Sequence, residues 1–251
     1  MDCVILAGGK CDNELKSKYG CENKADLLFG NKRVIEIVEE AIVNANISEK
    51  IICVGNQTKN SISVNSGTTF LESIKNGIEK CNSEKILIIT CDLPFLTPQA
   101  ITEFINKCDE NACLNWPIIP LENCKNAFPN MRRTSLKLKE GTFTGGNAAL
   151  ILNSRFQKIF PVIEQAYAAR KKPLKLASFI GVGFLFRVLI SPFFPGQLSL
   201  RLIESIISKK LGDTAKAVIT EDPSLGADVD NLMQYQQALE IYLKNPSNLN
   251  V

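Results

Sequence analysis

In the first hundred residues, short apolar runs alternate with segments whose apolar positions recur once per helical turn. A short apolar run bounded by glycine or polar residues is typical of a buried strand, and helical spacing of apolar residues is typical of an amphipathic helix. The predicted strands are residues 4–6, 50–55 and 85–90, and the predicted helices are residues 33–45, 70–81 and 98–108. Three strand–helix repeats predict a parallel sheet flanked by helices and joined by right-handed crossovers.

The pattern becomes less regular beyond residue 110, where prolines interrupt residues 111–147. The later predicted elements are a strand at 148–152, a helix at 154–170, a strand at 216–219 and a helix at 231–244. No internal repeat, low-complexity block or clear linker separates these segments. We therefore expect one α/β domain over residues 1–251, with residues 174–211 as an apolar helical insertion.

Composition and charge exclude several classes of function. The chain has 251 residues, 45% of them apolar, which is enough for a large core, and it contains no histidine, which excludes catalysis or metal binding by imidazole. Its nine cysteines are odd in number and lack CxxC spacing, and the N-terminus lacks the features of a signal peptide, so a reducing cytoplasm is the expected compartment. A formal charge of +3 without a dense basic run gives no reason to expect nucleic acid as a partner.

A glycine pair follows the first predicted strand, in the sequence Leu6-Ala7-Gly8-Gly9-Lys10. Two glycines allow backbone amides to approach a ligand closely, and successive N–H groups can form an anion-binding cradle. The run lacks the spacing of a Walker P-loop and of the dinucleotide-binding fingerprint. An ordinary turn at the end of a strand is the alternative interpretation.

Two charged residues are candidates for the chemistry. Lys24 lies where the glycine loop must return to the fold, and could place a positive charge on a triphosphate, or could be a solvated surface lysine. Asp92 lies just past the end of the buried strand 85–90, where open α/β sheets bind ligands, and one carboxylate is a usual protein ligand for Mg²⁺. A turn residue or helix cap is the alternative for Asp92.

Near the C-terminus, Asp228 and Asp230 occupy alternate positions of a short segment, so both side chains could face one metal ion. Asp230 could instead cap the predicted helix that begins at Asn231. A second glycine pair precedes the strand at 148–152, and an arginine pair precedes it in turn. The segment Thr144-Gly145-Gly146-Asn147 could bind a polar ligand or could be a hairpin loop, and the arginine pair, Arg132 and Arg133, could bind a phosphate.

Taken in order, these motifs resemble the MobA-like NTP transferase family, which is similar to the cytidylyltransferase of isoprenoid synthesis and the sugar-1-phosphate nucleotidyltransferases. The resemblance covers residues 1–153 and returns at 216–244. It implies a Rossmann-like, GT-A-type three-layer sandwich with a mostly parallel sheet. It also implies that Leu6–Lys10 binds the base and phosphates of a nucleotide, that Lys24 neutralises the triphosphate, and that Asp92 with Asp228 or Asp230 binds Mg²⁺. Thr144, Gly145, Gly146 and Asn147 would then lie on the side of the second substrate, the acceptor, with Arg132 and Arg133 as candidates for binding its phosphate.

The resemblance implies transfer of a nucleoside monophosphate from an NTP, GTP or CTP, to a phosphorylated small-molecule or lipid-linked acceptor. One departure concerns the loop after the glycine pair, where relatives usually carry an arginine and this chain has Lys16 and Lys18. Lysine cannot make the bidentate contacts of a guanidinium group, so the resemblance does not predict which base the protein binds. A glycosyltransferase that uses a nucleotide-sugar, favoured by the Asp-Val-Asp form at 228–230, and a non-catalytic nucleotide-binding module are the alternatives.

The segment 174–211 is an addition relative to the smaller family members. Between Phe179 and Gly196 it carries a single charge, Arg187, but glycines and prolines interrupt it, which argues against a transmembrane helix. It could form a buried helical hairpin, a homodimer surface, an apolar acceptor site or a peripheral membrane contact through 174–200. The basic run at 169–175 beside it could meet phosphate or lipid headgroups.

Overall fold

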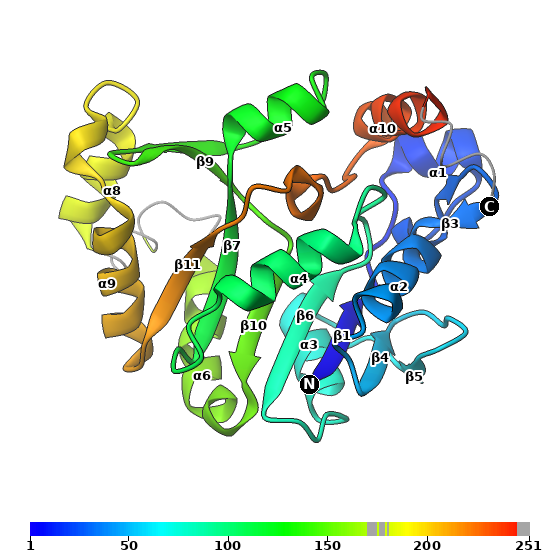
Figure 1. Ribbon diagram of the computed structural model, residues 1–251, viewed down its shortest axis with the longest axis horizontal. Coiled ribbons are helices and arrows are strands. Elements are labelled where there is room, and N and C mark those ends of the chain that lie inside the picture. The colour runs from blue at the N-terminus through cyan, green and yellow to red at the C-terminus, as the bar shows by residue number, and fades with distance from the viewer. Residues whose placement is uncertain (170–174, 176–178, 180, 245–251) are drawn as a thin grey trace.

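The computed structural model describes residues 1–169, 175, 179 and 181–244. At the centre of its sheet, β1 (Asp2–Leu6) pairs in parallel with β4 (Lys50–Val54) on one side and with β6 (Lys85–Thr90) on the other. A short strand, β5 (Ile62–Val64), extends the parallel part beyond β4 (Figure 1). The three strands predicted in the first hundred residues are therefore confirmed, and their carboxyl ends meet at one edge of the sheet.

The remaining strands make the sheet mixed. β10 (Ala148–Leu152) is antiparallel to both β6 and β7 (Leu114–Pro120), and β11 (Ala215–Ile219) runs parallel to β7. β9 (Gly141–Gly145) pairs antiparallel with the end of β7 and with β8 (Ser135–Leu138). The strand order is β5-β4-β1-β6-β10-β7-β9-β8, with β11 beside β7.

Helices cover both faces of this sheet, and the alternation of side chains along β1 shows how. Cys3 and Ile5 point to the core under α2 (Val34–Ala45) and α4 (Pro98–Lys107). Val4 and Leu6 point to the opposite core, under α3 (Phe70–Ile78) and α6 (Asn153–Ala169). The result is the expected three-layer α/β sandwich.

Local signals place the helix that follows β6. The Thr97 hydroxyl accepts the backbone N–H of Ala100 at 3.0 Å, so Thr97 caps α4. Since this capping role is filled, Asp92 is not needed as the cap of the helix that follows it.

A smaller core lies beyond the carboxyl ends of the strands, where α10 lies beside the N-terminal elements that follow β1 (Figure 1). It joins the helix α10 (Leu232–Lys244) to N-terminal elements through the aromatic pairs Phe29–Tyr235 and Phe29–Tyr242. Those N-terminal elements are α1 (Asn13–Tyr19), the 3₁₀ turn η1 (Lys24–Asp26), β2 (Leu28–Phe29) and β3 (Lys32–Arg33). Two further elements, α5 (Leu121–Ala127) and η3 (Pro223–Gly226), flank β7.

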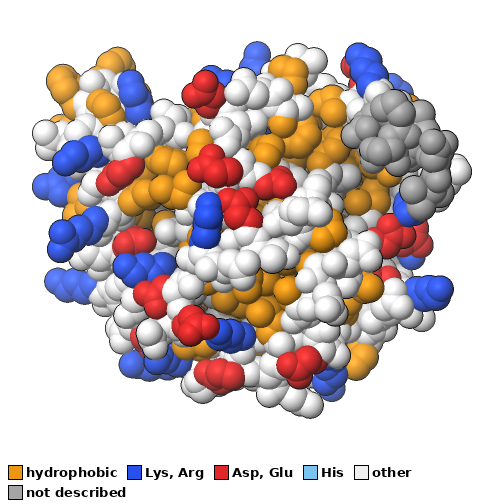
Figure 2. All heavy atoms as spheres, viewed as in Figure 1, with side chains coloured by type: hydrophobic (Ala, Val, Ile, Leu, Met, Phe, Trp, Pro, Cys, Tyr) orange, Lys and Arg blue, Asp and Glu red, His pale blue; other side chains and the backbone are white. Residues whose placement is uncertain are grey.

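The expected insertion contains α8 (Val182–Ile190), η2 (Pro195–Gln197) and α9 (Leu200–Leu211). Phe184 and Val188 of α8 pack against the core of the β8–β9 hairpin, but α8 has no buried residue. The large apolar side chains that it and the following turn expose are Val182, Phe186, Leu189, Phe193 and Phe194. Figure 2 shows hydrophobic side chains at this upper left corner, with Lys and Arg side chains below them.

Within the described residues, this segment therefore does not form a buried helical hairpin. Among the described residues of the whole chain, no helix has both the length and the apolar character to cross a bilayer. Of the basic run at 169–175, residues 170–174 lie outside the described part of the chain.

Candidate active site

The glycine loop after β1 is held by the segment that follows α1. Lys24 N–H donates to the Gly9 carbonyl at 2.9 Å, and the Asn23 amide donates to the Ala7 carbonyl at 2.9 Å. Ala7 itself is fully buried in the core, so only its backbone can face a ligand. The backbone N–H groups of Gly8 and Gly9 have no acceptor among the described residues, and both glycines are exposed.

The absence of a side chain at Gly8 lets two other loops approach it. A Cβ on Gly8 would lie 2.9 Å from the Cβ of Ser66, and a Cβ on Gly55 would lie 2.6 Å from the Gly8 Cα. Gly55 also has φ +90°, which side-chain-bearing residues rarely adopt. The loops after β1, β4 and β5 therefore converge as closely as backbones can.

Lys24 points from this loop into a group of carboxylates. Its Nζ lies 2.5 Å from Asp230 Oδ1 and 3.4 Å from Asp92 Oδ2, and 15% of the side chain is exposed. Burial would lower the pKa of Lys24, but the carboxylates of Asp92 and Asp230 outweigh it, so the pKa lies above its ordinary value. The lysine is thus cationic, and it is not a solvated surface residue.

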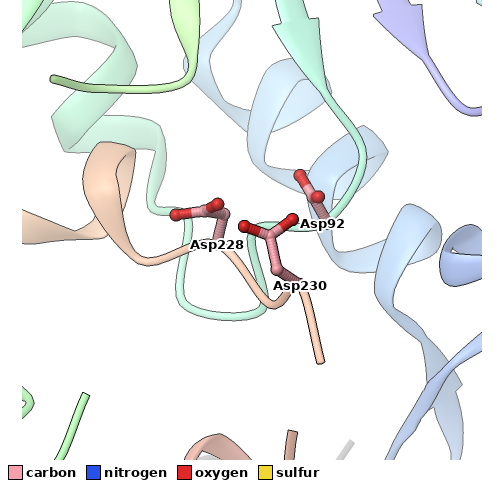
Figure 3. Close-up of side chains that lie close together, drawn as sticks. All are labelled: Asp92, Asp228 and Asp230. Carbon is pink, nitrogen blue, oxygen red and sulfur yellow. The ribbon is translucent and has the colours of Figure 1, made fainter. Parts of the chain in front are cut away.

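The three aspartates come from two segments far apart in sequence. Asp92 follows β6, and Asp228 and Asp230 lie between η3 and α10. The backbone joins the two segments, since Val229 N–H donates to the Asp92 carbonyl at 3.0 Å. One carboxylate oxygen from each aspartate lies within 4.8 Å of the others, and Figure 3 shows the three side chains turned toward a common point.

Neither C-terminal aspartate is a helix cap. Asn231 accepts the backbone N–H of Gln234 at 3.0 Å and so caps α10 in place of Asp230. Asp228 forms an ion pair with Arg133, whose guanidinium also donates to the Asp228 carbonyl at 3.1 Å.

The electrostatic settings of the two C-terminal carboxylates differ. Burial raises the pKa of Asp228 and the neighbouring carboxylates of Asp92 and Asp230 raise it further, against the opposing effect of Arg133. Burial also acts to raise the pKa of Asp230, but the bond from Lys24 outweighs it and the pKa falls below its ordinary value.

These residues fit a divalent cation. Asp92 Oδ1 is buried and has no hydrogen-bond partner among the described residues, and such an orphaned carboxylate oxygen is costly unless a cation satisfies it. Mg²⁺ takes oxygen ligands from one or two carboxylates together with phosphates and waters. Asp92, Asp228 and Asp230 offer that donor set.

A cavity of about 320 Å³ lies beside Lys24 and Asp92. Leu6, Gly8 and Gly9 line it on one side, and the loop 66–69 with the first turn of α3 lines it on the other. Sequence analysis missed this second wall, which supplies Ser66, Thr68, Thr69 and Ser73. A signal was present: Thr69 accepts the N–H of Glu72 at 3.1 Å, as the N-cap of a helix that follows a glycine-containing loop.

The candidates for binding a second substrate divide into three groups. The Asn147 side chain acts to lower the pKa of Asp228, and Arg133 is held at the aspartates as described. Gly145 and Arg132 are exposed. The other two have structural roles, because the buried Thr144 hydroxyl donates to the Thr134 carbonyl at 2.9 Å, and a Cβ on Gly146 would lie 2.8 Å from Pro117 Cγ.

The lysines after the glycine pair contribute less to the site than the resemblance implied. Lys10 is exposed, and only the backbone at this position is held, by a bridge to Asn23. Lys16 pairs with Glu22 at 2.7 Å on the exposed side of α1. Neither side chain lines the cavity beside Lys24.

Comparison with known proteins agrees with this fold. Residues 3–119 match the model of the MobA-like NTP transferase domain. A hypothetical transferase from Thermus thermophilus is 30% identical, with a TM-score of 0.85 over 95% of this chain and 99% of that one. A search of curated protein sequences gives no match.

More distant solved structures share the fold alone. The 4-diphosphocytidyl-2C-methyl-D-erythritol synthase from Anaerococcus prevotii has a TM-score of 0.56 at 14% identity, over 97% of this chain and 98% of that one. A CMP:2-keto-3-deoxy-manno-octonic acid synthetase complexed with CTP has a TM-score of 0.61 at 9% identity, over 97% and 98%. The fold is thus that of the α/β nucleotidyltransferases. The chain belongs to the MobA-like NTP transferase family.

Proposed function

We propose that this nucleotidyltransferase moves a nucleoside monophosphate from an NTP to a phosphorylated acceptor, in a Mg²⁺-dependent reaction that releases pyrophosphate. The observation that carries the proposal is the position of Lys24, between Asp92 and Asp230 and beneath the unpaired amides of Gly8 and Gly9. Fixed positive charge, open N–H donors and a carboxylate cluster at one point are what a polyphosphate with its cation requires.

In the proposed step, an oxygen of the acceptor phosphate bonds to the α-phosphorus of the NTP. The bond from the α-phosphorus to the bridging oxygen breaks, and its electron pair leaves with pyrophosphate. A phosphate nucleophile is already ionised near neutral pH, so the chain needs no general base, and the lack of histidine is no obstacle. Lys24 and the amides of Gly8 and Gly9 stabilise the charge that develops on the phosphate oxygens.

Asp92, Asp228 and Asp230 are the residues that would hold the Mg²⁺ ion. When bound, this ion would neutralise phosphate charge and orient the reacting groups. Arg133 keeps the Asp228 side chain in position, and with Asn147 it places polar groups on the acceptor side of the aspartates.

The cavity beside Lys24 is assigned to the nucleoside. On its second wall, the Ser66 hydroxyl has no partner among the described residues and can meet a polar edge of a base or ribose. The Thr68 hydroxyl donates to Glu72 and can still accept a hydrogen bond, whereas the buried Ser73 hydroxyl is used within the protein. Hydroxyls both donate and accept, so this wall suits either GTP or CTP, and the proposal leaves both as substrates to be compared.

The proposal is tested by incubating the protein with each NTP, Mg²⁺ and a panel of phosphorylated acceptors, and measuring pyrophosphate. Release that requires both an acceptor and Mg²⁺ is the expected result. Consumption of a nucleotide-sugar in place of an NTP would support a glycosyltransferase, and NTP binding without turnover would support a non-catalytic module; either outcome contradicts the proposal.

Contact of 174–200 with a membrane surface and formation of a homodimer stay predictions. The exposed apolar side chains of α8 and the neighbouring basic side chains support the first. Co-sedimentation with anionic and neutral liposomes at low and high salt, together with the molar mass in solution, tests both. Absence of liposome binding at low salt would exclude the membrane contact.

A further inference from the structure

A second cavity, of about 330 Å³, adjoins the candidate active site. It lies between α3 and α6, over the face of β6 and β10, and we call it the α3–α6 pocket. It shares Leu6, Phe70 and Thr90 with the cavity beside Lys24, and its lining also includes Asn147. The two cavities are therefore neighbours on either side of Phe70, and the α3–α6 pocket begins at the acceptor side of the aspartates.

Polarity is distributed unevenly along this pocket. Its polar side chains, Thr90 and Asn147, are both at the end nearest the aspartates, and the rest of the lining consists of apolar side chains and Gly146. The wall formed by α6 consists of Phe156, Phe160 and Ile163. The pocket thus has one polar end, at the reacting centre, and an otherwise apolar interior.

Apolar side chains around the pocket are left partly open to solvent. Phe70 is 43% exposed, although its ring stacks on Tyr167 of α6 with centroids 5.6 Å apart. Ile74, Phe160 and Ile163 are also only partly buried. A ligand that covers these side chains would gain the free energy of removing apolar surface from water.

We propose that the acceptor is an amphiphile, a phosphate monoester whose hydrocarbon chain lies in the α3–α6 pocket. This inference rests on the proposed function, and it names the class of the acceptor. The phosphate would lie at Asn147 and the aspartates, and the hydrocarbon would extend between Ile74 and the α6 wall. Alkyl and isoprenoid phosphates share this chemistry.

A nucleobase is a poorer occupant of this pocket. A base presents several hydrogen-bonding groups, and each one buried without a partner weakens binding. The backbone groups of β6 and β10 that form the floor are used in pairing the two strands. The other cavity is lined by hydroxyl groups that can still bond a base, those of Ser66 and Thr68.

The test uses a series of alkyl phosphates from ethyl to decyl as acceptors, each below its critical micelle concentration, with NTP and Mg²⁺. If the chain enters the pocket, kcat/KM for pyrophosphate release should rise with chain length by about fourfold per buried methylene until the pocket is full. A kcat/KM that does not depend on chain length would overturn the inference while leaving the proposed function in place. If no acceptor of any length releases pyrophosphate, the proposed function itself fails.

Two variants test the location. The side chain of Ala149 lines the pocket, so Ala149→Phe should fill it and lower kcat/KM for decyl phosphate at least tenfold. The affinity for NTP, measured by equilibrium binding, should not change, because Ala149 does not line the nucleotide cavity. An equal loss of NTP affinity would assign the pocket to the nucleotide and overturn the inference.

The second variant avoids the risk that a larger core residue prevents folding. Ile163→Ser replaces a partly exposed residue on the α6 wall, and it should flatten the chain-length dependence. Ile62→Ser is the matched control, since Ile62 is 48% exposed on β5 and does not line either cavity. If the two serine variants have the same effect, the α6 wall does not hold the hydrocarbon.

Discussion

At the amino end of β1, the buried carboxylate of Asp2 accepts the backbone N–H groups of Asn82 at 2.6 Å and Ser83 at 3.0 Å. At the carboxyl end of the same sheet, the carboxylate of Asp92 keeps one buried oxygen without a partner in the described chain. Asp2 is a buried residue of β1, whereas Asp92 is partly exposed and follows the neighbouring strand β6. The carboxylate of Asp2 is satisfied within the protein, and that of Asp92 is not.

The same contrast extends beyond these two residues. The buried side-chain oxygens without a hydrogen-bond partner in the described residues are Thr90 Oγ1, Asp92 Oδ1, Thr220 Oγ1, Ser224 Oγ and Gln237 Oε1. They follow the carboxyl ends of β6 and β11 or lie on α10, and Figure 1 shows these segments gathered at one end of the sheet. One end of the sheet is thus built for stability, and the other keeps polar groups available for ligands.

The largest expected effect is that of Asp92→Asn, which tests whether the carboxyl end of the sheet is the catalytic end. Removing one carboxylate from the cluster should lower kcat by about 10²–10³-fold, a magnitude typical for losing one group that stabilises transition-state charge. Asp109→Asn, in a loop at the amino end of β7, is the matched control and should keep full activity. Pyrophosphate release by Asp92→Asn near the rate of the unmodified protein would contradict the assigned role.

Lys24→Ala should lower kcat/KM by about 10²-fold, because it removes the cation positioned for the triphosphate. The loss should appear in both kcat and KM, since Lys24 would contact the substrate before and during transfer. Steady-state kinetics of pyrophosphate release provide the measurement. A loss confined to thermal stability, with kinetic constants unchanged, would show that the lysine only neutralises the aspartates.

Gly8→Ala tests whether the backbone of the glycine loop binds the nucleotide. The added Cβ would lie 2.9 Å from the Ser66 Cβ, so the loop must shift away from the cavity. We expect KM for NTP to rise by about tenfold, which corresponds to about 1.4 kcal/mol of binding. Gly145→Ala serves as the control, since a Cβ there has no neighbour within 4 Å; equal effects of the two variants would contradict the expectation.

The smallest effect is expected at the amino end. Burial would raise the pKa of Asp2, but the N–H groups of Ser83 and Asn82 outweigh it and lower that pKa. Asp2→Asn should therefore cost about 1 kcal/mol of unfolding free energy at pH 7 and leave kcat unchanged. A lowered pKa stabilises the fold above the unfolded value and loses that effect as pH falls through the folded value.

The unfolding free energies of the unmodified protein and of Asp2→Asn are measured by urea denaturation between pH 7 and pH 3. The difference in stability between unmodified and variant protein should be constant near neutral pH and shrink in acid. A difference that grows in acid would have the wrong sign and would contradict the role given to Asp2.

Sequence patterns predicted the regular half of the fold well, because its strands are apolar runs and its helices carry ordinary caps. They failed between residues 111 and 147, where β7 contains Pro117 and Pro120 and changes its antiparallel partner along its length, from β10 to β9. Proline removes a ladder hydrogen bond, so a strand of this kind gives a weak signal. The antiparallel direction of β10 depends on long-range pairing, which a local pattern does not contain.

The candidate site was predictable where a residue follows a strand directly, as Asp92 does. The convergence of Asp228 and Asp230 on it could be expected only from the family resemblance, since it depends on the pairing of β11 with β7. The pairing of Arg133 with Asp228 was beyond local reasoning, because it depends on how loops from different strands meet. The Thr69 cap marks the start of α3 in the sequence, but the place of the loop 66–69 beside the glycine loop depends on the same long-range packing.

The positive groups around the aspartates have a consequence for how a substrate enters. Without ligand, Lys24 and Arg133 act as built-in counter-ions for Asp230 and Asp228. A bound polyphosphate would compete with Asp230 for Lys24, and the Asp230 carboxylate would then be available to hold a divalent cation. Loss of the ion pair with Lys24 would be compensated by the cation, so nucleotide and cation together would bind more readily than either alone.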